Sequence, residues 1–399
     1  MDTKELMEWS DKHLMTFAKR YPVALVRGEG VRVWDSDGME YLDFTGGIAV
    51  TALGHCHPKV VGTMREQAAT LLHVSNLFHI PPQIHLAKLL CDHSFADRVF
   101  FSNSGAEANE TAIKLARKWA KEQGASDRGD IISMRGGFHG RTLATVTATA
   151  QEKYHHGFEP LPGGFKYVPF NDLRAVERAI DSRTAAVLVE PIQGEGGVNV
   201  PDDGYLPGLR KLCDEAGVLL ILDEIQTGMG RTGKLWGYEH AGVAPDIMTL
   251  AKALANGVPI GATLATEHVA RVFTPGTHGS TFGGNPFATA VGLTVFTTLV
   301  EERLPERAAL MGRVLRERLV DLQSAHPRAV REVRGRGLLV AIDLAPPVAD
   351  VVSACRVRGL LVLTAGDNAL RLAPPLIVDE PSIERAVEII GRALGDVGT

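Results

Sequence analysis

The chain has 399 residues, of which 45% are hydrophobic and 22% charged, and its formal net charge is −5 at pH 7. This length predicts two or three domains, and the near balance of 42 basic against 47 acidic residues argues against a nucleic-acid or membrane surface. The four cysteines are scattered, which argues against a disulfide framework and a zinc ribbon. Because the chain has neither a signal-peptide pattern nor an apolar run long enough to span a membrane, we expect a cytoplasmic protein.

In chain order, the pattern predicts an N-terminal segment, a large domain and a smaller C-terminal domain. Residues 1–54 predict a helix and a small hairpin, which we expect to pack with the small domain. Residues 55–280 alternate strands with helices, which is typical of a mostly parallel sheet. Residues 281–399 predict a smaller α/β domain. The elements expected in it are a helix over 286–323, strands at 338–344, 360–363 and 369–372, and helices over 348–357 and 380–394.

Three apolar runs in the large domain each lead to a residue that can do chemistry. They are 185–189 before Glu190, 218–222 before Asp223, and 246–251 before Lys252. Short continuous apolar runs are typical of strands that are buried on both faces of a parallel sheet. Ligands of such sheets lie beyond the carboxyl ends of the strands, so these two carboxylates and one lysine predict an active site.

The turn between the predicted strand 98–101 and the helix 106–122 is a candidate anion site. Ser104 and Glu107 fit a capping box, and the small residues around them leave amide groups bare at a helix start that favours an anion. Taken alone, the stretch is better explained as an ordinary capped helix. The glycine-rich stretch 228–234 resembles a nucleotide P-loop, but Leu235 stands where the magnesium-binding Ser or Thr belongs, so we reject a nucleotide triphosphate site.

The chemistry at the strand ends suits pyridoxal 5'-phosphate (PLP). A pyridine ring that acts as an electron sink needs a carboxylate against its nitrogen, and the buried Asp223 is suited to this. Lys252 could form the imine, because burial lowers a lysine pKa toward the range of nucleophilic work. Phe138 could lie over the ring. Taken singly, Asp223 is better explained as an N-cap residue and Lys252 as a solvated lysine at a helix start.

Six sequence blocks together resemble the class III (ω-amino acid) aminotransferases, which have the fold type I PLP architecture. In order, they are Ser-Gly-Ala-Glu-Ala-Asn-Glu at 104–110, Phe-His-Gly-Arg-Thr at 138–142, Glu-Pro-Ile-Gln-Gly-Glu-Gly-Gly at 190–197, Asp-Glu-Ile-Gln at 223–226, Thr-Leu-Ala-Lys at 249–252 and Ser-Thr-Phe-Gly-Gly-Asn-Pro at 280–286. The likeness covers nearly the whole chain. It implies an α/β fold with a large PLP-binding domain and a small domain.

The resemblance implies a role for each matched residue toward the cofactor. Lys252 would bind PLP covalently and move the proton, and Asp223 would pair with the pyridine nitrogen. The other implied contacts are Gln226 with the ring hydroxyl, Phe138 and Ile225 with the two ring faces, Ser104, Gly105 and Ala106 with the phosphate, and Thr281 with the phosphate of the partner subunit. A homodimer with shared sites follows from the last of these.

The resemblance also implies how two substrates share one pocket. Arg371 matches the arginine that holds the α-carboxylate of glutamate and 2-oxoglutarate, and Glu195 matches a switch residue that neutralises it. Arg141 matches the arginine that holds the far carboxylate of the ω-amine substrate, and Ser280 belongs to the same substrate-binding set. Unaided, the alternation around Arg371 predicts only that it faces away from its two leucine neighbours.

The expected reaction moves the δ-amine of N-acetylornithine to 2-oxoglutarate, giving N-acetylglutamate 5-semialdehyde and glutamate, a step of arginine biosynthesis. Ornithine aminotransferases carry a tyrosine where this chain has Ile48, and an apolar residue better suits an acylated α-amine. Succinyl-diaminopimelate, ornithine and 4-aminobutyrate stay open as amine substrates. The family has a tyrosine just before Arg-x-Pro, whereas the segment from Phe17 through Tyr21 to Pro22 has a phenylalanine and an extra residue, so the resemblance assigns no substrate contact here.

Three readings from other classes are weaker. His55, Cys56 and His57 with the distant His139 could form a zinc site, but no acidic partner lies close in sequence. A non-catalytic PLP-binding regulator needs a DNA-binding module, for which the chain has no room. An aminomutase needs no external acceptor, so dependence on 2-oxoglutarate would exclude it.

Overall fold

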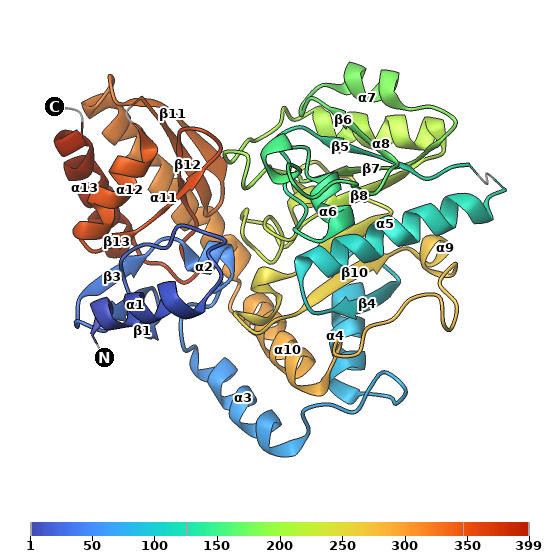
Figure 1. Cartoon of the computed structure of the whole chain (residues 1–399), viewed down its shortest axis with the longest axis horizontal. Helices are drawn as coiled ribbons and strands as arrows, with labels where there is room; N and C mark the ends of the chain where they lie inside the picture. The colour runs from blue at the N-terminus through green and yellow to red at the C-terminus, as the bar shows by residue number, and fades with distance from the viewer. Residues whose placement is uncertain (1, 125–126, 346, 398–399) are drawn as a thin grey trace.

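The computed structural model describes residues 2–124, 127–345 and 347–397 as an α/β protein built on a seven-stranded sheet (Figure 1). The strand order is β4-β10-β9-β8-β7-β5-β6, and only β10 runs antiparallel to its neighbours. The strands are β4 (Arg98–Ser102), β5 (Asp130–Met134), β6 (Phe165–Val168), β7 (Thr184–Val189), β8 (Leu219–Asp223), β9 (Ile247–Leu250) and β10 (Gly261–Ala265). The predicted α/β fold with a mostly parallel central sheet is confirmed.

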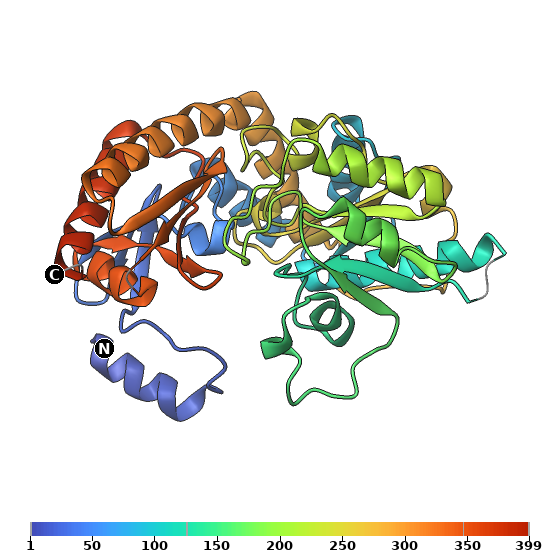
Figure 2. The same ribbon diagram turned by 90° about the horizontal axis from the view of Figure 1, so that it is seen from above.

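Helices cover both faces of this sheet (Figure 2). The helices of this part of the chain are α3 (Pro58–Thr70), which packs on the later helix α10 (Pro286–Glu301) and not on the sheet, α4 (Pro81–Asp92), α5 (Gly105–Glu122), α6 (Leu143–Ala148), α7 (Leu173–Ala179), α8 (Tyr205–Ala216) and α9 (Glu267–Ala270), with 3-10 turns η1 (Glu152–Tyr154), η2 (Gly237–His240) and η3 (Lys252–Ala255). In β8, Leu219 and Ile221 pack on the α5 side, whereas Leu220 and Leu222 belong to the core on the other face. A strand covered on both faces must be apolar at every position, which explains the continuous runs in the sequence.

The C-terminal part carries an antiparallel sheet in the order β11-β12-β15-β14. Its elements are α10 (Pro286–Glu301), α11 (Leu304–Ala325), β11 (Val330–Arg336), β12 (Leu339–Leu344), α12 (Val348–Val357), β13 (Leu360–Leu361), β14 (Leu363–Ala365), β15 (Ala369–Leu372) and α13 (Glu380–Val397). The predicted single helix over 286–323 is wrong. It is two helices, because Arg303 adopts φ +52° between them and Pro305 fits only in the first turn of the second. Strand β11 was not predicted.

The N-terminal segment lies beside the C-terminal elements (Figure 1). It contains α1 (Thr3–His13), β1 (Leu25–Glu29), β2 (Arg32–Asp35), β3 (Glu40–Asp43) and α2 (Gly46–Ala49). Strand β3 pairs in parallel with β13, so the predicted hairpin extends into a four-stranded sheet completed from the far end of the chain. The division into domains at 54/55 and 280/281 stays a prediction.

Among the described residues, no helix is both long and apolar enough to cross a membrane.

Candidate active site

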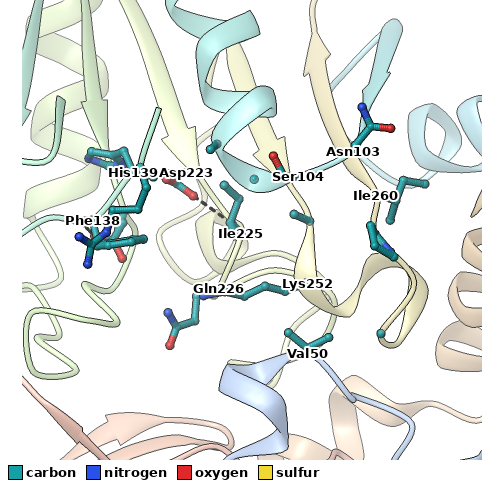
Figure 3. A pocket seen from close by; sticks show the side chains of 18 of the residues that line it. Val50, Asn103, Ser104, Phe138, His139, Asp223, Ile225, Gln226, Lys252 and Ile260 are labelled. Atoms are coloured by element: carbon teal, nitrogen blue, oxygen red, sulfur yellow. Dashed lines mark hydrogen bonds and ion pairs between the residues drawn. The ribbon is translucent and has the colours of Figure 1, made fainter. Parts of the chain in front are cut away.

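A cavity of about 430 Å³ lies beyond the ends of β7, β8 and β9 (Figure 3). The predicted site residues that line it are Ser104, Gly105, Ala106, Phe138, Arg141, Asp223, Ile225, Gln226 and Lys252. The parallel strands bring their carboxyl ends to one edge of the sheet, and residues far apart in sequence meet there. Glu190, the third strand-end residue, lines the same cavity.

Asp223 ends β8 and is 3% exposed. Its Oδ2 accepts hydrogen bonds from Asn109 Nδ2 and His139 Nδ1, both at 2.8 Å, and its Oδ1 accepts from the Ile225 amide at 3.1 Å. Burial lowers the pKa of His139, but the hydrogen bond to Asp223 and the charges of Asp223 and Glu190 outweigh burial and leave the pKa raised. Asn109 and His139 therefore fix the orientation of the Asp223 carboxyl at the cavity wall.

Glu190 is a second carboxyl in the floor of the cavity. It is 5% exposed, and burial raises its pKa to about 7 against the opposing charge of His139. Its two oxygens accept hydrogen bonds from the amides of Phe138 and Gly194, each at 2.9 Å. Glu190 therefore fixes the backbone of the loop that carries Phe138 and the start of the loop that leads to Glu195.

The first turn of α5 forms an anion cradle at the cavity wall. Ser104 is the N-cap, and its Oγ accepts from the Glu107 amide at 3.2 Å, so the predicted cap is confirmed. The first amide that donates within the helix is that of Ala108, to the Ser104 carbonyl at 3.0 Å, so the amides of Gly105 and Ala106 have no acceptor inside the helix, and both residues line the cavity. A Cβ on Gly105 would lie 2.8 Å from Ile225 Cδ1, so this position has no room for a side chain.

Lys252 follows β9 at the start of η3 and projects to the cavity (Figure 3). Its φ of +44° lies in the left-handed region, which costs a lysine free energy and is typical of functional positions. Burial lowers the pKa of the Lys252 amine, although the charge of Glu195 acts in the opposite direction. A lysine with a lowered pKa holds more of the neutral, nucleophilic amine at neutral pH.

Arg371 reaches the site from β15 and is 3% exposed. Its Nη1 donates to Glu195 Oε1 at 2.5 Å and to Gln226 Oε1 at 3.0 Å. Gln226 Nε2 in turn donates to Glu195 Oε1 at 3.4 Å. The alternation in β15 does turn Arg371 away from its leucine neighbours, but that side is buried rather than solvated.

Arg141 lies in the loop before α6, is exposed, and lines the cavity. Its guanidinium carbon lies 3.8 Å from the ring centre of Tyr154 and 5.3 Å from that of Phe138. Within the described parts of the chain, Arg141 takes part in no ion pair and no hydrogen bond. Arg141 thus lines the cavity without an ion pair, whereas Arg371 is paired with Glu195 and contacts Gln226, which lines the cavity.

Several predicted residues lie outside this cavity. Ser280 Oγ accepts from Asn103 Nδ2 at 3.2 Å and so touches its rim, whereas Thr281 is exposed. Ile48 is 45% exposed, in the turn before Val50, and Val50 is the residue that lines the cavity. Two further positions of doubtful role, Phe17 and Tyr21, are 85% and 44% exposed and do not reach it.

The rejected nucleotide loop and the proposed zinc cluster serve other purposes. Arg231 in the glycine-rich loop is 2% exposed and donates to the carbonyls of Leu338 and Pro374, so the loop joins the large part of the chain to the C-terminal sheet. His55 pairs with Asp43 at 2.8 Å. In residues 2–124, 127–345 and 347–397, no group of three His, Cys, Asp or Glu side chains could hold a metal.

Sequence reasoning gave no role to Asn109 and His139, although both bind Asp223. Asn109 carried a usable signal, because it is a polar residue on the apolar face of α5 and is fully buried. Its side-chain oxygen accepts from Thr249 Oγ1 at 2.8 Å, so it ties the ends of β8 and β9 together. His139 was weighed only as a possible metal ligand.

Known proteins resemble this chain over its whole length. The family model described as aminotransferase class-III matches residues 16–394. Acetylornithine aminotransferase of Caldanaerobacter subterraneus subsp. tengcongensis is 50% identical over 394 residues, which are 98% of this chain and 100% of that protein. The crystal structure of acetylornithine aminotransferase from Elizabethkingia anophelis is 37% identical with a TM-score of 0.89, covering 99% of this chain and 100% of that one. The ornithine aminotransferase of Toxoplasma gondii, described with partial occupancy of PLP at its active site, is 37% identical with a TM-score of 0.95, covering 99% and 95%.

Proposed function

The chain belongs to the class-III aminotransferase family, and on that premise we propose that it transfers the δ-amine of N-acetylornithine to 2-oxoglutarate with PLP as cofactor. Relatives named acetylornithine aminotransferase match at 45% to 53% identity along nearly the full chain, which supports this substrate. The single observation that carries the proposal is that Arg141, free of ion pairs among the described residues, lines the cavity, while Arg371, paired with Glu195, contacts the cavity-lining Gln226. Such a site suits two substrates whose carboxylates lie at different distances from the reacting amine.

The residues around the cavity fit PLP by their donor set. The bare amides of Gly105 and Ala106 would bind the phosphate, and Asp223, oriented by its hydrogen bond with His139, would pair with the ring nitrogen. Phe138 and Ile225 would cover the two ring faces. When bound, PLP supplies an electron sink for the carbon that carries the amine.

Protein groups would do the remaining work of the reaction. Lys252, with its lowered pKa, would accept and return the proton at the carbon next to the amine. Arg141 would bind the carboxylate of N-acetylornithine while Glu195 keeps the charge of Arg371 neutralised. When 2-oxoglutarate enters, its α-carboxylate would displace Glu195 from Arg371.

We also propose a homodimer in which Thr281 of each subunit binds the phosphate in the other. The exposure of Thr281 beside the 61% exposed Phe282 supports a covered surface here. Leu77 and Phe78, which are 86% and 65% exposed, support the same conclusion. The cytoplasmic location stays a prediction.

The test is a half-reaction on the purified holoenzyme, followed through the absorbance of the bound cofactor. N-acetylornithine, ornithine, succinyl-diaminopimelate and 4-aminobutyrate are added separately, and 2-oxoglutarate is then added to restore the starting spectrum. We expect N-acetylornithine to react fastest. Faster reaction of another amine would overturn the substrate but keep the reaction type, whereas a protein without a cofactor band would overturn the PLP assignment.

A further inference from the structure

The segment after α6 is fixed to the loop that carries Phe138 and Arg141. Gln151 Nε2 donates to the carbonyl of Gly137 at 2.9 Å. His155 Nε2 donates to two carbonyl oxygens at the end of α6, at 2.9 and 2.8 Å. Between these two anchors lies η1, so the ring of Tyr154 at its end is held in a defined place although it is only half-buried.

The Tyr154 ring contacts both functional side chains of that loop. The Arg141 guanidinium carbon lies over its face at 3.8 Å from the centre, and the Phe138 ring meets it edge-on, with centroids 6.1 Å apart and planes at 88°. A cation at this distance from a ring face is attracted to the π-electrons. Unlike a carboxylate, the ring leaves the N–H groups of the guanidinium unoccupied.

We propose that Tyr154 is a positioning residue that holds Arg141 for the carboxylate of the amine substrate, an inference that rests on the proposed function. An exposed arginine has many rotamers, and ordering it when substrate binds costs free energy. A glutamate partner would order Arg141 equally well but would compete with the substrate carboxylate. The aromatic ring orders the side chain and keeps its charge available, so recognition of the carboxylate depends on the ring and not on the tyrosine hydroxyl.

Two variants separate the ring from the hydroxyl. Within the described chain the Tyr154 hydroxyl has no hydrogen-bond partner, so Tyr154→Phe keeps the proposed interaction and Tyr154→Leu removes it. Two amine substrates isolate the contribution of the substrate carboxylate, because N-acetylputrescine is N-acetylornithine without its carboxyl group. The measured quantity is the second-order rate constant of the half-reaction for each holoenzyme with each amine.

We expect Tyr154→Leu to lower the rate constant for N-acetylornithine by roughly 3- to 30-fold, which is the range of a partly desolvated cation–π contact. The rate constant for N-acetylputrescine should not change, and Tyr154→Phe should behave like the wild type with both amines. The Kd of unreactive N-acetylnorvaline, measured by calorimetry, should rise by a similar factor. If Tyr154→Leu lowers the rate constants for both amines equally, or keeps the wild-type preference for N-acetylornithine over N-acetylputrescine, the role of Tyr154 is overturned. A wild-type enzyme without any preference for N-acetylornithine over N-acetylputrescine would overturn the proposed substrate itself, and the role of Tyr154 with it.

Discussion

Arg141 lines the cavity and Arg371 contacts its wall at Gln226, and the surroundings of the two arginines differ in burial and in charge. Arg371 comes from the antiparallel sheet, is 3% exposed, and donates to a carboxylate and an amide. Arg141 comes from a loop beside the large sheet, is exposed, and is held by aromatic rings. Each set of surroundings holds its guanidinium in place, but only the surroundings of Arg371 include a carboxylate that balances its charge.

The difference has a physical reason. Burying a guanidinium costs free energy, and the hydrogen bonds that Arg371 makes to Glu195 and Gln226 offset part of that cost. The exposed Arg141 is solvated and needs only orientation, which a ring provides. An enzyme that alternates between two substrates can therefore keep one carboxylate subsite always open and the other closed by its own side chain.

The largest expected effect comes from Arg371→Leu. We expect the half-reaction with 2-oxoglutarate to slow by about 100-fold or more, because truncating one partner of a buried charge pair commonly costs 2–5 kcal/mol. The half-reaction with N-acetylornithine should change much less, since its carboxylate would bind Arg141. Single-turnover rates of both halves provide the measurement.

A control is needed because Arg371→Leu leaves Glu195 without its partner. The double variant Arg371→Leu with Glu195→Gln removes that unpaired charge and should show the same loss toward 2-oxoglutarate. If both halves slow by the same factor in the double variant, the two arginines do not divide the substrates between them.

The sequence could predict which residues form the site more readily than how they meet. Alternation in β15 places Arg371 opposite its leucine neighbours, but every residue of this strand is buried, so the pattern cannot tell which side meets solvent. Glu195, its partner, lies 176 positions away, and His139 lies 84 positions from Asp223. Such pairs depend on tertiary packing, whereas the strands themselves follow from local apolar runs.

One error in the predicted fold was avoidable. The apolar periodicity over 286–323 continues across a break, and periodicity alone predicted one helix. Pro305 was visible in the sequence and marks the first turn of a new helix, because a proline inside a helix removes a hydrogen bond and clashes with the preceding turn. The break matters little for the site but sets where α11 begins.

A smaller effect is expected from Glu195→Gln, which removes the charge that neutralises Arg371 but keeps a side chain of similar shape. Glutamate would no longer need to displace an anion, and N-acetylornithine would face an unpaired buried cation. We expect the ratio of glutamate to N-acetylornithine half-reaction rates to rise roughly 10-fold, equivalent to about 1.4 kcal/mol. Glu195→Asp, which retains the charge, is the matched variant and should stay closer to the wild type. An unchanged ratio in Glu195→Gln would mean that Glu195 does not control access to Arg371.

The smallest expected effect is on stability and depends on pH. Burial alone would raise the pKa of Glu195, but the charge of Arg371, followed by that of Lys252, outweighs burial and leaves the pKa below its ordinary value of 4.5. A carboxyl whose folded pKa is lowered contributes stability above its unfolded pKa and loses it as the pH falls through the folded pKa.

The free energy of unfolding of the wild-type holoenzyme should therefore exceed that of Glu195→Gln by about 1 kcal/mol near pH 7. This difference should shrink as the pH falls below about 4.5, the range where the unfolded carboxyl begins to bind its proton. Urea titrations at equal protein concentration measure it, and Glu317→Gln, at an exposed glutamate on α11 outside the site, provides the comparison. A difference at Glu195 that stays constant down to pH 3 would mean that shape and hydrogen bonding, and not charge, join Glu195 to Arg371. Arg371 would then be held as Arg141 is, without being neutralised.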